Sequence, residues 1–157
     1  MMADNSKIEW TNATWNPITG CSVVSAGCKN CYAMKLAGTR MRHHPSRAGL
    51  TVKTKEGPVW NGQVRLNEEW LNLPLRWKKP RRIFVCAHGD LFHENVPDEG
   101  LDWVFAVMAL ARADGVISHG HAQEHGGVGV KMDLTGKKNA GRLLDGVEHN
   151  GFPQEWV

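Results

Sequence analysis

The sequence lacks any hydrophobic run that approaches the ~18 apolar residues of a membrane span, so no transmembrane helix is expected. Its first residues, MMADNSKIEW, also lack the apolar stretch that forms the centre of a secretory signal peptide. We therefore expect a cytoplasmic protein without a signal peptide. Cysteines stay reduced in that compartment, so disulfide bonds are not expected.

Cysteine is scarce, and its placement is uneven. The 157-residue chain has four cysteines, and three of them, Cys21, Cys28 and Cys31, form a C-x6-C-x2-C pattern. Gly20 and the small residues at 25–27 allow the backbone to fold around a common centre. Clustered cysteines in a reduced chain indicate metal ligands rather than disulfide partners.

Two kinds of metal centre are compatible with this pattern. Three thiolates directed at one point suit a soft metal or an iron–sulfur cluster, and a cluster with three protein ligands leaves one iron open to a small molecule. A zinc ion would want a fourth protein ligand, for which Cys86 or a histidine is available. The alternative to an iron–sulfur protein is thus a zinc-binding module for nucleic acid or protein interaction.

The net charge is small, because 19 Lys and Arg residues nearly balance 16 Asp and Glu residues to give +3. One segment is nevertheless strongly basic, with five cations in seven residues. Such a run contacts nucleic-acid phosphates in some proteins, although a solvated collar before a buried strand is the commoner explanation. The cations are Arg76, Lys78, Lys79, Arg81 and Arg82.

The expected elements follow the order of an α/β protein. Residues 10–18 favour a first strand with a bend at Asn16-Pro17, the cysteine loop follows, and residues 32–41 favour a helix. The apolar run at 83–87 predicts a buried parallel strand. Asp90 comes just after it, at the strand end where α/β sheets bind ligands.

Other segments are harder to assign from their residues. A second helix is expected from Asp98 onward, with an apolar stripe that needs covering on more than one side. Residues 42–63 are expected to form a long surface loop, and 64–77 have helical spacing that Pro74 interrupts. Residues 113–130 are rich in glycine and contain His119, His121 and His125, and we expect a loop or disorder there rather than a histidine metal site.

Several stretches together resemble one family. They are KIEWTNATWNPITGC, GCKNCYA, PLRWKKPRRIFV, DLFHENVPDE and VFAVMALA, and they cover roughly residues 7–111. They look like the N-terminal third of a phage and prophage family usually called the phage gene-product 37/68 family, whose members carry a three-cysteine motif. GKKNAGRLLDG followed by GFP resembles the same family's C-terminus. Members of this family are similar to radical S-adenosylmethionine (SAM) enzymes.

The resemblance implies a partial (β/α) barrel with a [4Fe–4S] cluster. Cys21, Cys28 and Cys31 would ligate three irons, and the fourth iron would take the amino and carboxylate groups of SAM. Reduction would then cleave SAM to a 5′-deoxyadenosyl radical that abstracts hydrogen from a substrate. The same resemblance implies that Asp90 accepts the SAM amino group and that Tyr32, beside the last cysteine, lines the cofactor site.

The chain departs from the pattern in three respects. The C-x6-C spacing is longer than the usual C-x3-C, and the aromatic residue follows the last cysteine instead of preceding it. Relatives also have several more βα units where this chain has about 25 residues. We therefore expect about two βα units in residues 1–112, an irregular segment over 113–157 and an internal deletion between head and tail. Such a chain would be catalytically incomplete or an inactive remnant, with a protein partner or self-association covering the missing barrel.

Overall fold

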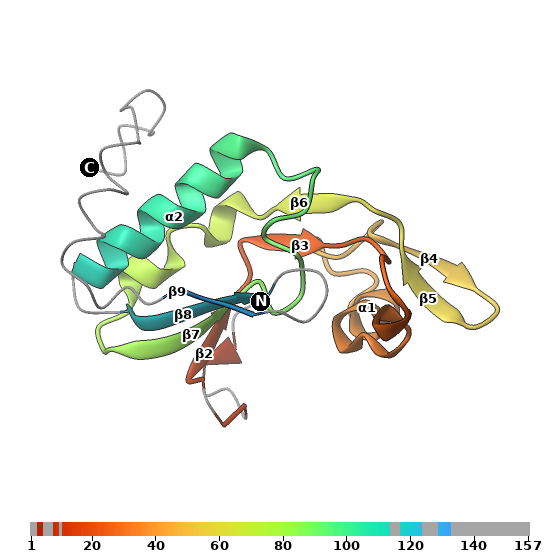
Figure 1. The fold of residues 1–157 in the computed structure, drawn as a ribbon, viewed down its shortest axis with the longest axis horizontal. Coiled ribbons are helices and arrows are strands. Elements are labelled where there is room, and N and C mark those ends of the chain that lie inside the picture. Colours follow the sequence, from red (N-terminus) through yellow and green to blue (C-terminus); the bar gives the residue numbers. More distant parts are fainter. Residues whose placement is uncertain (1–2, 5–7, 10, 114–116, 124–128, 133–157) are drawn as a thin grey trace.

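The structure is a computed structural model that describes residues 3–4, 8–9, 11–113, 117–123 and 129–132. Its main element is a five-stranded sheet with the strand order β1-β2-β7-β8-β9 (Figure 1). The strands are β1 (Ala3–Asp4), β2 (Ala13–Trp15), β7 (Arg81–Val85), β8 (Ile117–Gln123) and β9 (Gly129–Met132). The helices of the described residues include none long and apolar enough to cross a membrane.

Two strands expected from the sequence form the middle of this sheet. β2 and β7 are parallel neighbours, with Ala13 opposite Ile83 and Trp15 opposite Val85. All of these side chains are buried. The bend expected at Asn16-Pro17 separates β2 from β3 (Ile18–Gly20). The apolar run in the sequence thus predicted the buried parallel strand correctly, within two residues at each end.

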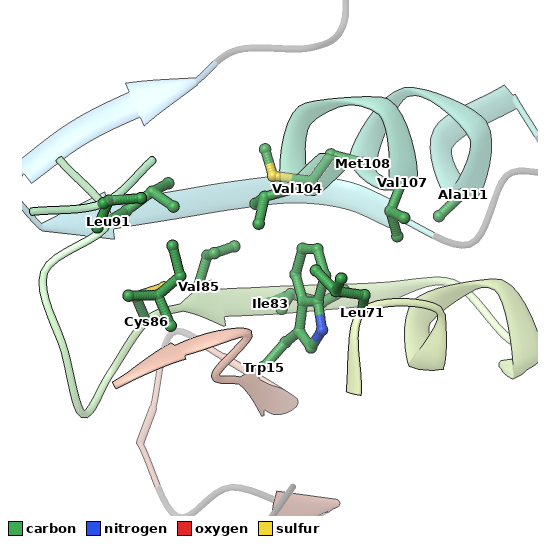
Figure 2. Close-up of a cluster of buried hydrophobic side chains, with 12 residues drawn as sticks. Trp15, Leu71, Ile83, Val85, Cys86, Leu91, Val104, Val107, Met108 and Ala111 are labelled. Atoms are coloured by element: carbon green, nitrogen blue, oxygen red, sulfur yellow. The ribbon is translucent and has the colours of Figure 1, made fainter. Parts of the chain in front are cut away.

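The helix expected after Pro97 is also present, as α2 (Asp98–Ala113). It lies across one face of the sheet (Figure 1). Figure 2 shows the contact: Val104, Val107 and Met108 of α2 face the side chains of Trp15 and Ile83. Burial of each such side chain stabilises the fold by roughly 1.5–3 kcal/mol, and the Trp15 indole N–H is satisfied by the carbonyl of Trp70 at 2.7 Å.

A smaller unit carries the cysteines. It consists of a 3₁₀ helix η1 (Ala26–Asn30), the helix α1 (Tyr32–Gly38) and the hairpin of β4 (Thr51–Thr54) and β5 (Gly57–Trp60). Helix α1 packs so closely on the hairpin that a Cβ on Gly38 would collide with Pro58. The buried core of this unit has only four side chains: Met34, Ala37, Leu50 and Trp60.

Two expectations for the middle of the chain were wrong. Residues 42–63 are not a simple surface loop, because they contain the β4–β5 hairpin and the buried Arg47. Residues 64–77 are not helical in their first part, because β6 (Val64–Leu66) pairs with β3. Two 3₁₀ helices, η2 (Glu68–Trp70) and η3 (Leu73–Arg76), follow it. Tertiary pairing overrides the local helical spacing here, and Pro74 is compatible with the start of η3.

The expectation of a loop or disorder at 113–130 was also wrong for its described part. β8 extends the sheet as a parallel neighbour of β7, and β9 pairs with β8 in the antiparallel direction. This glycine-rich segment has no strand-like pattern of its own, but the unpaired edge of β7 offers it backbone hydrogen bonds. His119 and His121 belong to β8, whereas His125 and the family-like tail lie outside the described residues. The chain is therefore α/β, and the described strands do not close into a barrel.

Candidate functional site

The site begins where two glycines bring two parallel segments into contact. Beyond the end of β2 and β7, Gly20 and Gly89 form a parallel bridge. The backbone N–H of Asp90 donates to the carbonyl of Gly20 at 3.1 Å, and a Cβ on Gly89 would lie 2.7 Å from the carbonyl oxygen of Ile18. Gly20 has φ +100°, which other residues rarely adopt. Cys21 and Asp90 therefore follow directly on adjacent segments at the carboxyl end of the sheet, as the sequence predicted for Asp90.

The other two cysteines lie around the start of α1. Cys28 belongs to η1, and Cys31 is the N-cap of α1, where its Sγ accepts a hydrogen bond from the Met34 N–H at 3.4 Å. All three cysteines are half-buried, and none of them forms a disulfide bond. Within the described residues, no group of three or more His, Cys, Asp or Glu side chains is arranged to hold a metal ion.

The electrostatics of the cysteines differ from one another. Burial raises the pKa of Cys21 to about 12, and the negative charges of Asp90, Cys31 and Cys28 add to that effect. Backbone N–H groups of Val24 and Ser25 instead lower the pKa of Cys28. A cation among these groups would offset their mutual repulsion and allow Cys21 to ionise. The charges of Asp90, Cys28 and Cys31 thus oppose ionisation of Cys21, although within the described residues these side chains are not arranged as a metal site.

Asp90 and Tyr32 differ strongly in exposure. The Asp90 side chain is buried, and its Oδ1 accepts a hydrogen bond from the Phe92 N–H at 3.0 Å. Tyr32 is 68% exposed, and its ring centroid lies 6.0 Å from that of His88. Asp90 is therefore held in place at the end of the sheet, whereas Tyr32 is open to solvent beside the last cysteine.

One pair of residues near the site was missed by the sequence analysis. Arg47 is 1% exposed, and its guanidinium donates to Nδ1 of His88 at 2.7 Å and to the hydroxyl of Ser46 at 2.7 Å. Burial, with the Arg47 charge as a further cause, lowers the pKa of His88 to about 4. His88 is therefore neutral at pH 7, with its proton on Nε2. No sequence pattern around Arg47 indicates its burial or its contact with His88, because its partner is far away in the sequence.

A second histidine, His93, connects the loop after β7 to the loop that contains Cys21. His93 is buried, and its Nδ1 accepts a hydrogen bond from the Asn95 N–H at 3.1 Å. In the neutral ring Nε2 then carries the proton, which it donates to the Ser22 hydroxyl at 2.8 Å. The loop after β7 thus holds the residue that follows Cys21.

Cys86 packs in a different core cluster from Cys21 and Cys31, and part of the basic run lies at the other end of β7. Cys86 is 2% exposed within the larger core cluster, whereas Cys21 and Cys31 pack against the smaller one. Of the basic run, Arg81 and Arg82 lie at the start of β7, the end opposite Asp90, and the Arg81 guanidinium is 5.0 Å from the Trp77 ring centroid. Nucleic-acid contact through this run stays a prediction, which salt-dependent binding to a DNA duplex would test.

The comparisons with known proteins give one result. A family model described as “Protein of unknown function (DUF5131)” matches residues 5–117. No significant match was found among curated proteins or among solved structures. The matched span contains all three clustered cysteines, Asp90, Arg47 and the sheet strands β2 and β7. It covers well over half of the sequence, and the chain therefore belongs to the DUF5131 family.

Proposed function

We propose that this chain is a radical-SAM-like protein of the phage type that binds a [4Fe–4S] cluster through Cys21, Cys28 and Cys31. The observation that carries the proposal is the bridge between Gly20 and Gly89. Because of it, a half-buried thiol and a buried carboxylate leave adjacent segments at the carboxyl end of a parallel pair, where α/β folds bind cofactors. The raised pKa of Cys21 supports a centre that supplies positive charge.

The residues around the cluster would have separate roles. Three thiolates would hold three irons, and the backbone N–H groups that lower the pKa of Cys28 would stabilise its thiolate. Asp90 would accept the ammonium group of SAM, because a carboxylate fixed by its own backbone hydrogen bond loses little freedom on binding. Tyr32 would cover the exposed side of the site. When bound, the cluster and SAM supply one-electron cleavage chemistry.

The chain by itself is proposed to be an incomplete (β/α) barrel and an incomplete enzyme. The described sheet has three parallel strands, β2, β7 and β8, and β9 then runs antiparallel to β8. A closed barrel has eight parallel strands, so much of a substrate pocket would have to come from elsewhere. A protein partner or a second copy of the chain would supply the missing wall. We therefore expect no sustained 5′-deoxyadenosine production when the reconstituted chain is incubated anaerobically with SAM and dithionite.

The zinc-binding alternative is less well supported. It needs a fourth protein ligand, either Cys86 or a histidine. Cys86 is buried in the larger core cluster while Cys21 and Cys31 pack on the smaller one, and no histidine is grouped with the cysteines as a metal site in the described residues. A cluster with an open iron needs only the three clustered cysteines. The burial of Cys86 in the other core cluster thus favours the three-ligand centre.

The test is anaerobic reconstitution with iron and sulfide. The parent chain should gain a broad absorption band in the visible blue that is lost on oxidation, and the double variant Cys28→Ser, Cys31→Ser should not. Cys86→Ala is the control that separates the two candidates, because it should keep full iron and sulfide content. A parent chain that takes up zinc but no iron and sulfide, and loses the zinc in Cys86→Ala, would refute the proposal. In loaded protein, Asp90→Ala should weaken SAM binding in calorimetry without changing iron content.

A further inference from the structure

The charge of the chain is unevenly distributed along the sequence. Residues 21–67, which include the cysteine unit of η1, α1 and the β4–β5 hairpin, contain eight of the 19 Lys and Arg residues and one of the 16 Asp and Glu residues. Their net charge is therefore +7, and the remaining 11 cations and 15 acids give the rest of the chain −4. The basic run at 76–82 lies outside this region. A charge asymmetry of this size favours an anionic partner.

Six of the eight cations are exposed to solvent. The other two are Arg47, which is buried, and Arg65, whose guanidinium donates to the carbonyls of Pro45 and Ala48. The one acid of the region, Glu56, lies in the hairpin turn. Figure 1 shows α1 and the hairpin together at one end of the molecule. The exposed cations on or beside these elements are Lys29, Lys35, Arg40, Arg42, Lys53 and Lys55.

The pairing of the hairpin places Lys53 beside the end of α1. Lys53 is opposite Pro58 in the hairpin, and Thr51, two residues earlier, points to the same side of it. A Cβ on Gly38 of α1 would collide with Pro58 and would lie 3.2 Å from the Thr51 hydroxyl. The side of the hairpin that carries Lys53 therefore faces the end of α1, and the exposed Arg40 follows that end directly.

Tyr32 adds an aromatic ring to this basic surface. It is 68% exposed, more than any other large hydrophobic side chain among the described residues. It is the first residue of α1, and Lys35 lies on the same face of the helix about one turn later. A single exposed aromatic residue needs no explanation on its own. An exposed ring among cations, however, is the combination on which proteins stack the bases of single-stranded nucleic acids.

We propose that the surface of Tyr32, Lys35, Lys53 and the neighbouring exposed cations binds single-stranded nucleic acid. The cations contact the phosphates, and the Tyr32 ring stacks on a base. The bases of a duplex are already stacked on one another, so the exposed ring favours a single strand over a duplex. The inference is independent of the proposed iron–sulfur function, because no iron takes part in the binding.

The experiment measures the affinity of the full chain for labelled oligonucleotides by fluorescence anisotropy, without added iron. The probes are oligo(dT) and oligo(rU) of about 16 nucleotides and a DNA duplex of the same length. We expect the parent to bind a single strand more tightly than the duplex, and the stronger of the two strands identifies DNA or RNA as the ligand. Tyr32→Leu should weaken that binding roughly tenfold, whereas Tyr32→Phe keeps the ring and should bind like the parent.

A matched pair of double variants tests the cations. Lys35→Gln with Lys53→Gln and Lys78→Gln with Lys79→Gln remove the same charge from exposed positions, the second pair in the basic run. Loss of two phosphate contacts should make the plot of log affinity against log salt less steep by about 1.4 in the first double variant. The second should retain the slope of the parent.

Three results would overturn the inference. They are a parent chain that does not bind a single strand at low salt or prefers the duplex, Tyr32→Leu with the affinity of the parent, and equal losses in the two lysine pairs. Circular dichroism of each variant checks that it folds like the parent. Because Tyr32, Lys35 and Lys53 are all exposed, we expect their substitution to leave the fold intact.

Discussion

The sheet with α2 and the unit that carries the cysteines are held together in different ways. Among the side chains that the structure describes, the sheet region encloses a core cluster of twelve buried residues, and the cysteine unit encloses four. The first region is stable through apolar burial. The second depends on close backbone approaches at Gly38 and Gly89 and on hydrogen bonds such as that from His93 to Ser22. The comparison indicates that the sheet is a scaffold, whereas the cysteine unit has little apolar core of its own and is expected to open more easily.

A matched pair of leucines tests this comparison with the largest expected effect. Leu71 belongs to the larger cluster and Leu50 to the smaller one, and each is 1% exposed. Leu71→Ala should lower the free energy of unfolding by about 3–5 kcal/mol, and Leu50→Ala by about 2–3 kcal/mol because a small cluster relaxes around the cavity more easily. Urea denaturation measures both. Equal losses at the two sites would contradict the distinction between scaffold and cysteine unit.

Substitution at the bridge between the two regions should have an intermediate effect. The Cβ of Gly89→Val would meet the backbone of Ile18 and Thr19 at 2.7 Å, so the segments that carry Cys21 and Asp90 must separate. We expect a destabilisation of about 1–3 kcal/mol and a marked loss of iron uptake on reconstitution. Gly27→Ala is the control, because its Cβ would meet only the Ser25 hydroxyl at an ordinary 3.6 Å. Full iron content in Gly89→Val would show that the bridge does not organise the site.

Acid should weaken the region beside the site through His88. Its pKa falls from 6.5 to about 4 on folding. Between these two pH values the His88 side chain is protonated in the unfolded chain and neutral in the folded chain. The stabilisation is complete above pH 6.5 and is lost as the pH falls toward 4, with an upper limit of about 3 kcal/mol. His88→Gln should reduce the fall in the urea midpoint between pH 7 and pH 4.5. His43→Gln, at an exposed position, should retain the parent's pH dependence, and an identical dependence in His88→Gln would exclude this origin.

The scaffold was largely predictable from the residues, and the cysteine unit only in part. β7 and α2 contain apolar residues in runs or stripes, and such patterns indicate burial directly. The position of Asp90 at the carboxyl end of β7 followed from the same reasoning. The β4–β5 hairpin and β6 did not, because their side chains are mostly half-buried or exposed and show no clear alternation. The residues of β8 have no strand pattern of their own, and they form a strand because they pair with β7.

The sequence by itself determined the α/β class, the three clustered cysteines, the carboxylate at the end of a buried strand and the helix that covers the sheet. These features rest on local spacing and on apolar burial, which both act along a short stretch of chain. Only the tertiary structure decided that Arg47 donates to His88, that His93 donates to Ser22 and that the Trp60 indole has no acceptor among the described residues. The physical reason is that the partners of a buried polar group are chosen by distance in space, and these partners lie far apart in the sequence or on different elements.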